Sequence, residues 1–188
     1  MAGGFNTPEL ASIVANSGGV GSFGFSFTSP EKIDEILNTT KKLTSGFINA
    51  NFFVFKPVKL PDKIVQEEAL KAIESLSLNE KYDINIPKEP FYYDLESQIE
   101  ATLKNLPSII TFHLGIPSLD IIKKIQSFGM KVGITATNIN EAKSIENVGA
   151  DFIVAQGIEA GGHRGIFDQE NIDEKITLDN LLIKILEN

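Results

Sequence analysis

The chain has 188 residues, of which 42% are hydrophobic and 22% charged, and its formal net charge is −8. These values are typical of a soluble globular protein and suffice for one domain with a sizeable core. The negative charge argues against nucleic acid and anionic membranes as partners, and the absence of cysteine excludes disulfides and thiolate chemistry. Without an apolar run of membrane-spanning length or a signal-peptide pattern, the sequence predicts a cytoplasmic protein.

The first half of the chain contains two helix-start signals. Thr7-Pro8-Glu9 and Ser29-Pro30-Glu31 each place a capping residue before a proline and an acid, which predicts helices ending at Gly18-Gly19 and near Leu43. Residues 20–25 fit either a short strand or a buried connection. Further along, the pattern predicts a strand at 47–54, a helix at 62–78 with apolar residues at helical spacing, and a proline-containing loop at 79–93.

The second half alternates strands with helices. Strands are predicted at 109–113, 131–135 and 152–156, and helices at 94–106, 118–128 and 138–148 and from Thr177 onward. Asn138 and Glu141 have the spacing of a capping box. This alternation predicts βαβ units and a parallel sheet. Since a closed (β/α)8 barrel takes roughly 250 residues, the pattern fits either a small open α/β sheet or part of a barrel.

One segment, Gln156–Gly165, has the features of a ligand site. It follows an apolar strand, and its closely spaced glycines allow the backbone to approach a flat or anionic ligand. His163 lies in this turn and His113 ends another predicted strand, so both histidines are expected on the same rim of the sheet. The amides of Asn51 and Gln156 suit the edge of a heterocycle.

Each of these residues also has a purely structural explanation. A histidine that follows a strand commonly serves as a hydrogen-bonded structural group, and an asparagine in a strand commonly marks a bulge. Glu159 and Arg164, which flank the turn, fit a solvated ion pair of little energetic weight. Two histidines without suitably spaced carboxylates do not predict a metal site.

Five ordered blocks of the sequence resemble the nitronate monooxygenase family, formerly called 2-nitropropane dioxygenases. The blocks are Met1 to Leu10, Asn16 to Gly21, Asn51-Phe52-Phe53, Thr111 to Gly115, and Gln156 to Gly165. The resemblance implies a TIM-barrel enzyme that uses FMN and O₂ to oxidise alkyl nitronates without needing NADH. It also implies that the redox chemistry belongs to the flavin, with the protein supplying orientation and charge.

Carried over residue by residue, the resemblance implies a cofactor-binding set and a catalytic pair. Asn51, Gln156, Gly161 and Gly162 would contact FMN, and Met1 would lie near the flavin ring. His163 would be the active-site base or the group that orients the nitronate anion, and His113 a second polar group of the active site. A neutral imidazole is suited to take the acidic α-proton of a nitroalkane, and a protonated imidazole is suited to hold a nitronate.

The chain departs from the family pattern at both ends. In the family a strand precedes the Met-Ala-Gly-Gly segment, and later strands carry the loops that bind the FMN phosphate. The sequence therefore predicts a partial TIM (β/α)8 barrel of α/β class with parallel strands. Residues 1–188 would form a single barrel segment that lacks the first strand and the C-terminal strands.

Three consequences are expected from such a segment. Residues 1–188 alone would bind FMN weakly or not at all, and would self-associate or need a complementing chain. Apolar strand residues would be exposed on the open sheet: Phe52, Val54, Ile134 and Ile153. Two alternative functions stay open: a flavin-dependent enoyl-acyl-carrier-protein reductase of the second type, and a non-catalytic or split fragment of such a barrel.

Overall fold

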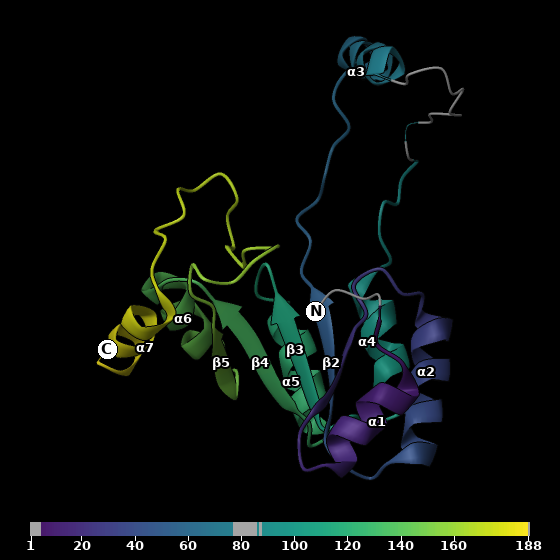
Figure 1. Ribbon diagram of the computed structural model, residues 1–188, viewed down its shortest axis with the longest axis vertical. Helices are drawn as coiled ribbons and strands as arrows, with labels where there is room; N and C mark the ends of the chain where they lie inside the picture. Colours follow the sequence, from purple (N-terminus) through teal and green to yellow (C-terminus); the bar gives the residue numbers. More distant parts are fainter. Residues whose placement is uncertain (1–4, 77–85, 87, 188) are drawn as a thin grey trace. The chain divides into compact units, whose positions relative to one another are not determined.

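The computed structural model describes residues 5–76, 86 and 88–187. In chain order the elements are α1 (Pro8–Asn16), β1 (Gly21–Gly24), α2 (Pro30–Leu43), β2 (Ile48–Phe53), α3 (Lys63–Leu76), α4 (Leu95–Leu103), β3 (Ile109–His113), α5 (Leu119–Ser127), β4 (Lys131–Ala136), α6 (Ile139–Asn147), β5 (Phe152–Ala155) and α7 (Leu178–Leu186). They divide into two compact units, Met1–Phe55 with Tyr93–Asn188, and Lys56–Tyr92. The first unit holds every described strand and every described helix except α3 (Figure 1).

The described strands form one parallel sheet in the order β1-β2-β3-β4-β5. Each strand thus pairs with the next one along the chain, and helices make the connections. In a (β/α)8 barrel the strands follow one another around the sheet in this sequential order. In a doubly wound sheet, by contrast, the strand order reverses beside the first strand. The chain is therefore an α/β protein that forms part of a (β/α)8 barrel, as predicted. The segment 20–25, whose structure the sequence left open, provides β1.

The helices begin where the sequence places capping residues. Thr7 Oγ1 accepts from the Leu10 amide at 3.2 Å, and prolines occupy the first turns of α1 and α2. At α6, Asn138 Oδ1 accepts from the Glu141 amide at 2.9 Å. The reciprocal half of the expected capping box is absent, because the Glu141 carboxylate accepts from the Thr137 amide and hydroxyl instead. Glu141 thereby fixes the turn between β4 and α6.

The core lies between the sheet and the helices packed on its outer face. Strand residues that face the helices are fully buried, among them Ala50, Phe52, Ile110, Phe112, Val132 and Ile134. The expectation that Phe52 and Ile134 are exposed is therefore wrong, and Val54 and Ile153 are half-buried. The expectation assigns these apolar residues to the wrong face of the sheet. Because side chains alternate along a strand, the face opposite the helices carries Asn51, Thr111 and Thr135.

The second unit contains α3. Asp62 Oδ1 caps its start by accepting from the Val65 amide at 3.0 Å, and the predicted end of the helix at 78 lies outside the described residues. No residue of α3 is buried, although its apolar residues have helical spacing. The Tyr92 hydroxyl donates to the Lys56 carbonyl at 2.7 Å and ties the two ends of the unit together. Among the helices described for the whole chain, none has both the length and the apolar character to cross a membrane.

Candidate active site

The inner face of the sheet, opposite the helices, lines an open cavity of about 530 Å³ at the carboxyl ends of the strands. The residues around it come from all five described strands and from the glycine-rich turn after β5: Ser22, Asn49, Asn51, Phe53, Thr111, His113, Thr135, Val154, Ala155, Gln156, Gly161, Gly162 and His163. Most of these residues are polar. Hydroxyls, amides and imidazoles line this cavity, and barrel enzymes bind their ligands at this end of the strands.

The floor of the cavity is a chain of hydrogen bonds between β2 and β3. Asn51 is the register partner of Thr111, and its Nδ2 donates to Thr111 Oγ1 at 2.9 Å and to the Thr111 carbonyl at 3.3 Å. Thr111 Oγ1 in turn donates to Asn49 Oδ1 at 3.1 Å. Because a backbone carbonyl only accepts, these contacts fix the orientation of the Asn51 amide. Its Oδ1 is left as an acceptor with no partner among the described residues.

The turn after β5 is held by the side-chain amide of Gln156. Its Oε1 accepts from the Gly165 amide at 2.7 Å, and its Nε2 donates to the His163 carbonyl at 3.3 Å. Gln156 therefore binds the backbone on both sides of Arg164. Since one partner only donates and the other only accepts, the orientation of this amide is also fixed.

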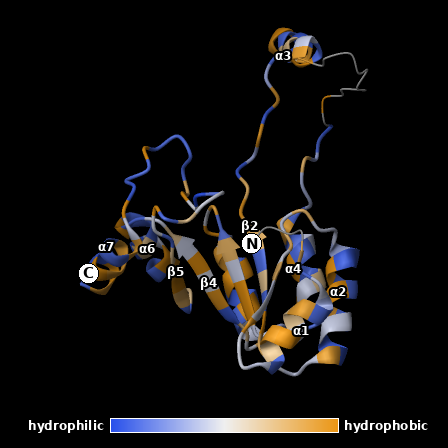
Figure 2. Cartoon of the chain, viewed as in Figure 1, coloured by the Kyte–Doolittle hydropathy of each residue, from blue (hydrophilic) through white to orange (hydrophobic). Residues whose placement is uncertain are grey.

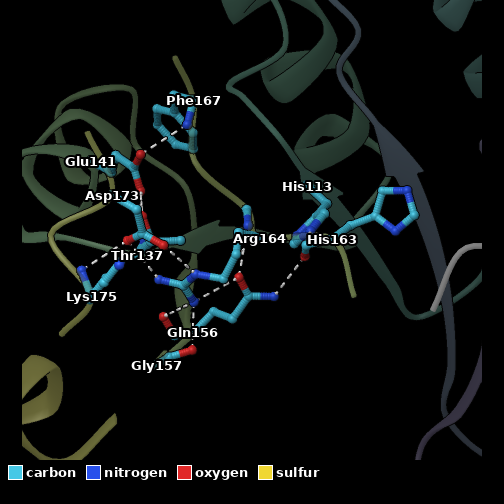
Figure 3. A network of polar contacts seen from close by, with 11 residues as sticks. His113, Thr137, Glu141, Gln156, Gly157, His163, Arg164, Phe167, Asp173 and Lys175 are labelled. Atoms are coloured by element: carbon cyan, nitrogen blue, oxygen red, sulfur yellow. Dashed lines mark hydrogen bonds and ion pairs between the residues drawn. The ribbon is translucent and has the colours of Figure 1, made fainter. Parts of the chain in front are cut away.

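Arg164 extends back from the turn to the end of β5 (Figure 3). Its guanidinium donates to the carbonyls of Gln156 and Gly157, to Gln156 Oε1, and to both carboxylate oxygens of Asp173. The side chains of Arg164 and Asp173 are only 16% and 19% exposed. The hydrogen bond from Arg164, and then one from the Lys175 amide, lower the pKa of Asp173 below its ordinary value.

On the other side of Gln156, the imidazole of His113 contacts the main chain of His163 (Figure 3). His113 Nε2 lies 3.1 Å from the His163 carbonyl, and because that oxygen can only accept, Nε2 carries the proton of neutral His113. Burial lowers the pKa of His113 below its ordinary value, against the opposing effect of this hydrogen bond. His113 is thus a neutral group at neutral pH. The imidazole of His163 is exposed and makes no hydrogen bond to the described residues.

Phe53 forms an aromatic wall beside both imidazoles. Its ring centroid lies 5.4 Å from that of His113 and 5.7 Å from that of His163. On its other side it contacts Phe27 and Phe55. The cavity consequently combines a polar floor with an apolar wall next to the histidines.

The glycines of the turn fall into two groups. A Cβ at Gly165 would lie 2.8 Å from both His113 and Thr135, and one at Gly157 would lie 2.4 Å from the Leu178 amide, so both positions are closely packed. A Cβ at Gly161 or Gly162 would meet nothing within 4 Å, and both residues line the cavity. Gly157 and Gly165 allow the turn to pack closely against its neighbours, whereas Gly161 and Gly162 leave open space in which a ligand can approach the backbone.

A family model described as nitronate monooxygenase matches residues 1–187. The chain belongs to the nitronate monooxygenase family. It is 35% identical over 179 residues to the nitronate monooxygenase of Paraburkholderia phytofirmans and 32% identical over 176 residues to that of Pseudomonas aeruginosa. These matches cover 92% of this chain but 48% and 50% of the two proteins. The chain thus spans about half the length of the curated relatives it matches.

Solved structures agree with the barrel fold. Nitroalkane oxidase from Streptomyces ansochromogenes matches with a TM-score of 0.84 and 27% identity, over 100% of this chain and 53% of that one. FabK from Thermotoga maritima matches with a TM-score of 0.66 and 19% identity, over 99% of this chain and 46% of that one. At the latter identity the likeness shows the fold alone. The family resemblance and the partial barrel inferred from the sequence are both confirmed.

The structure brings most of the predicted site residues together around one cavity. Asn51, Gln156, Gly161, Gly162, His113 and His163 all line it, whereas Met1 lies outside the described residues. The explanation of Glu159 and Arg164 as an ion pair is wrong. Arg164 pairs with Asp173, and the Glu159 carboxylate accepts from the Leu178 amide at the start of α7. Among the described residues, no three or more His, Asp or Glu side chains are grouped so as to hold a metal ion.

Sequence reasoning missed several residues of the site. Asn49, Phe53 and Thr111 lie two residues from a predicted site residue on the same strand, so the period of two places them on the inner face. The alternation of side chains along each strand, counted from Asn51 and His113, was therefore a signal that could have found these three residues. Asp173 had none, because it lies nine positions beyond Arg164 in a segment without a periodic pattern.

Proposed function

We propose that this chain forms the FMN-binding and proton-handling half of an enzyme that oxidises alkyl nitronates with O₂. The observation that carries the proposal is the joint placement of both histidines, the open glycines and the polar floor around one cavity at the carboxyl ends of parallel strands. Family membership supports the reaction class. The chain spans half of its curated relatives, so the activity belongs to the proposal.

The donor set fits a flavin. Asn51 Oδ1 is a fixed acceptor that suits an N–H at the edge of a flat heterocycle, and Gly161 and Gly162 leave space for close approach of a ring or a chain. Gln156 lines the same cavity, while its amide atoms already bind the turn. FMN bound here supplies the redox chemistry, and the chain's residues bind and orient the reactants.

The two histidines have different roles in this proposal. His163 has an exposed imidazole that is suited to take the α-proton of a nitroalkane in its neutral form, or to bind a nitronate oxygen when protonated. His113 stays neutral through burial and holds the His163 main chain in place. Phe53 gives the alkyl group of the substrate an apolar surface beside the two rings.

The test has a binding arm and a turnover arm. FMN is titrated into the isotopically labelled chain, and amide shift changes are expected at Asn51, Gly161, Gly162 and His163 even where the affinity is weak. Shifts confined to other residues, or none at millimolar FMN, would contradict the proposed site. Nitronate-dependent O₂ uptake without NADH is expected, and rapid reduction of the flavin by NADH would favour the reductase alternative.

His163→Asn separates catalysis from structure. With the neutral nitroalkane as substrate, the variant is expected to lower kcat by about 100-fold or more, the range of a lost general base, while the FMN affinity changes less than about threefold. An equal loss of turnover and of FMN affinity would show that the histidine is structural. His113→Asn is the comparison variant, because it removes the other imidazole from the same cavity.

A further inference from the structure

The segment between β5 and α7 has no helix or strand, yet it carries the site's glycines and His163 (Figure 1). Figure 2 shows that most of it is hydrophilic, in contrast to the strands beside it. Phe167 packs against the core and Ile176 is buried, so hydrophobic packing anchors the later part of the segment, whereas the glycine-rich turn before Phe167 is polar. Its geometry depends on the polar contacts that tie it to the rest of the fold.

The Arg164–Asp173 pair is the strongest of these contacts. Two parallel bonds, Nε to Oδ2 at 2.9 Å and Nη2 to Oδ1 at 3.2 Å, give it the bidentate geometry that only arginine provides. The pair is largely shielded from solvent. Removing one partner of such a pair leaves the other charge without compensation in a poorly solvated place, so both residues are needed to keep the turn in position.

Arg164 binds the backbone of Gln156, and Gln156 binds the backbone of the two residues that flank Arg164. Arg164 Nη1 donates to the carbonyls of Gln156 and Gly157, at the end of β5. The Gln156 amide binds the His163 carbonyl and the Gly165 amide, on either side of Arg164. The turn is therefore attached to the strand from both directions, and neither side chain can move without releasing the other.

The His163 carbonyl connects the turn to His113 at the end of β3. It accepts from Gln156 Nε2 at 3.3 Å and from His113 Nε2 at 3.1 Å. The position of this one oxygen decides which nitrogen of His113 holds the proton. The same residue's side chain is the exposed imidazole that lines the cavity.

We propose that Arg164 and Asp173 are positioning residues. Acting through the Gln156 amide and the His163 carbonyl, they fix the proton of His113 on Nε2 and hold the His163 imidazole at the wall of the cavity. Gln156 then serves mainly to position the turn, in place of the direct cofactor contact that the family resemblance implies. The catalytic consequence rests on the proposed function, whereas the effect on His113 does not.

The chain is well suited to a direct test because it has only two histidines. Labelling histidine with ¹⁵N gives the tautomer and the titration midpoint of each imidazole by NMR, without flavin or substrate. In the wild-type chain we expect His113 protonated on Nε2, with a midpoint below 6.5. In Asp173→Asn and in Arg164→Lys we expect a mixture of tautomers and a midpoint that moves further below 6.5, because the hydrogen bond to the His163 carbonyl, which raises the pKa of His113, is weakened.

Asp151→Asn is the matched control. Asp151 precedes β5, at the end of the strand opposite the turn, and pairs with Lys131 at 2.7 Å. Burial raises the pKa of Asp151, but hydrogen bonds from Lys131, the Val132 amide and Gln126 outweigh it, so the pKa lies below its ordinary value. The control variant loses an acid–base pair whose lysine is more exposed than Arg164, and its His113 signals are expected to match those of the wild type.

The outcomes are distinct. Unchanged His113 signals in both Asp173→Asn and Arg164→Lys would overturn the proposal, as would an equal change in Asp151→Asn, which would reveal a general loss of structure. Should one variant fail to fold, the other still decides, since Arg164→Lys keeps the charge while losing the bidentate geometry. In the FMN-loaded protein, kcat is expected to fall about 10- to 100-fold with KM nearly unchanged. Absence of turnover in the wild type would contradict the proposed function alone.

Discussion

Gly165 and Gly161 lie in the same turn, and the structure gives opposite predictions for replacing each by alanine. A Cβ at Gly165 would lie 2.8 Å from His113 Cε1 and from Thr135 Cγ2, whereas ordinary contact begins at 3.4 Å. The neighbours must therefore give by about 0.6 Å, the difference of these two distances. Overpacking of this kind costs about 1–3 kcal/mol. For a chain of this size the melting temperature should fall by roughly 2–12 °C.

Gly161→Ala is the matched control for stability. A Cβ there meets nothing within 4 Å, so the free energy of unfolding should change by less than about 0.5 kcal/mol. The added methyl group enters the cavity, however, and should weaken FMN binding about tenfold, or by about 1.4 kcal/mol. Urea denaturation and FMN titration measure the two effects. Equal destabilisation by both variants would refute the packing argument, and unchanged FMN affinity in Gly161→Ala would remove this glycine from the proposed cofactor site.

Two further predictions concern stability. Ser12 is buried in α1 with no hydrogen-bond partner for its hydroxyl among the described residues, so Ser12→Ala should stabilise the protein by about 1 kcal/mol and raise its melting temperature by roughly 2–4 °C. Ser17→Ala, which loses a bond to the Ile13 carbonyl, should give no such gain, and destabilisation by Ser12→Ala would disprove the reasoning. Because the pKa of His113 is lower in the folded state, the unfolded chain binds more protons below pH 6.5, and stability should fall as the pH drops from 7.5 to 5.5. Urea midpoints at the two pH values should differ less in His113→Gln than in the wild type, and an undiminished difference would assign the effect to other groups.

The order and type of the elements could be predicted because local signals agree with the global fold. Caps at Thr7, Ser29 and Ser118 form the hydrogen bonds that their positions predict. Strand and helix alternation then leaves few arrangements for a parallel sheet. The site at the carboxyl ends of the strands follows from this topology alone, which is why the sequence suffices to place His113 and His163 on the same rim.

Which face of each strand is buried could not be predicted in the same way. In β2 and β4 the apolar residues other than Phe53 face the helices, and the inner face of the sheet holds amides and hydroxyls that line a cavity. A sequence rule that assigns apolar residues to the barrel interior gives the wrong phase here. Phe52 is buried against the helices, and its neighbour Phe53 faces the cavity.

Long-range polar contacts set the remaining limit. Arg164 has a neighbouring acid in the sequence, Glu159, but its partner is Asp173, and Glu159 instead caps α7. Nothing in the spacing distinguishes the two carboxylates, because the segment has no period that fixes which side chains face each other. The choice is made by the fold: the turn brings the guanidinium onto the carbonyls of Gln156 and Gly157, and Asp173 binds its remaining nitrogens. The part of the site that sequence reasoning could not reach is thus the part that holds its two histidines in place.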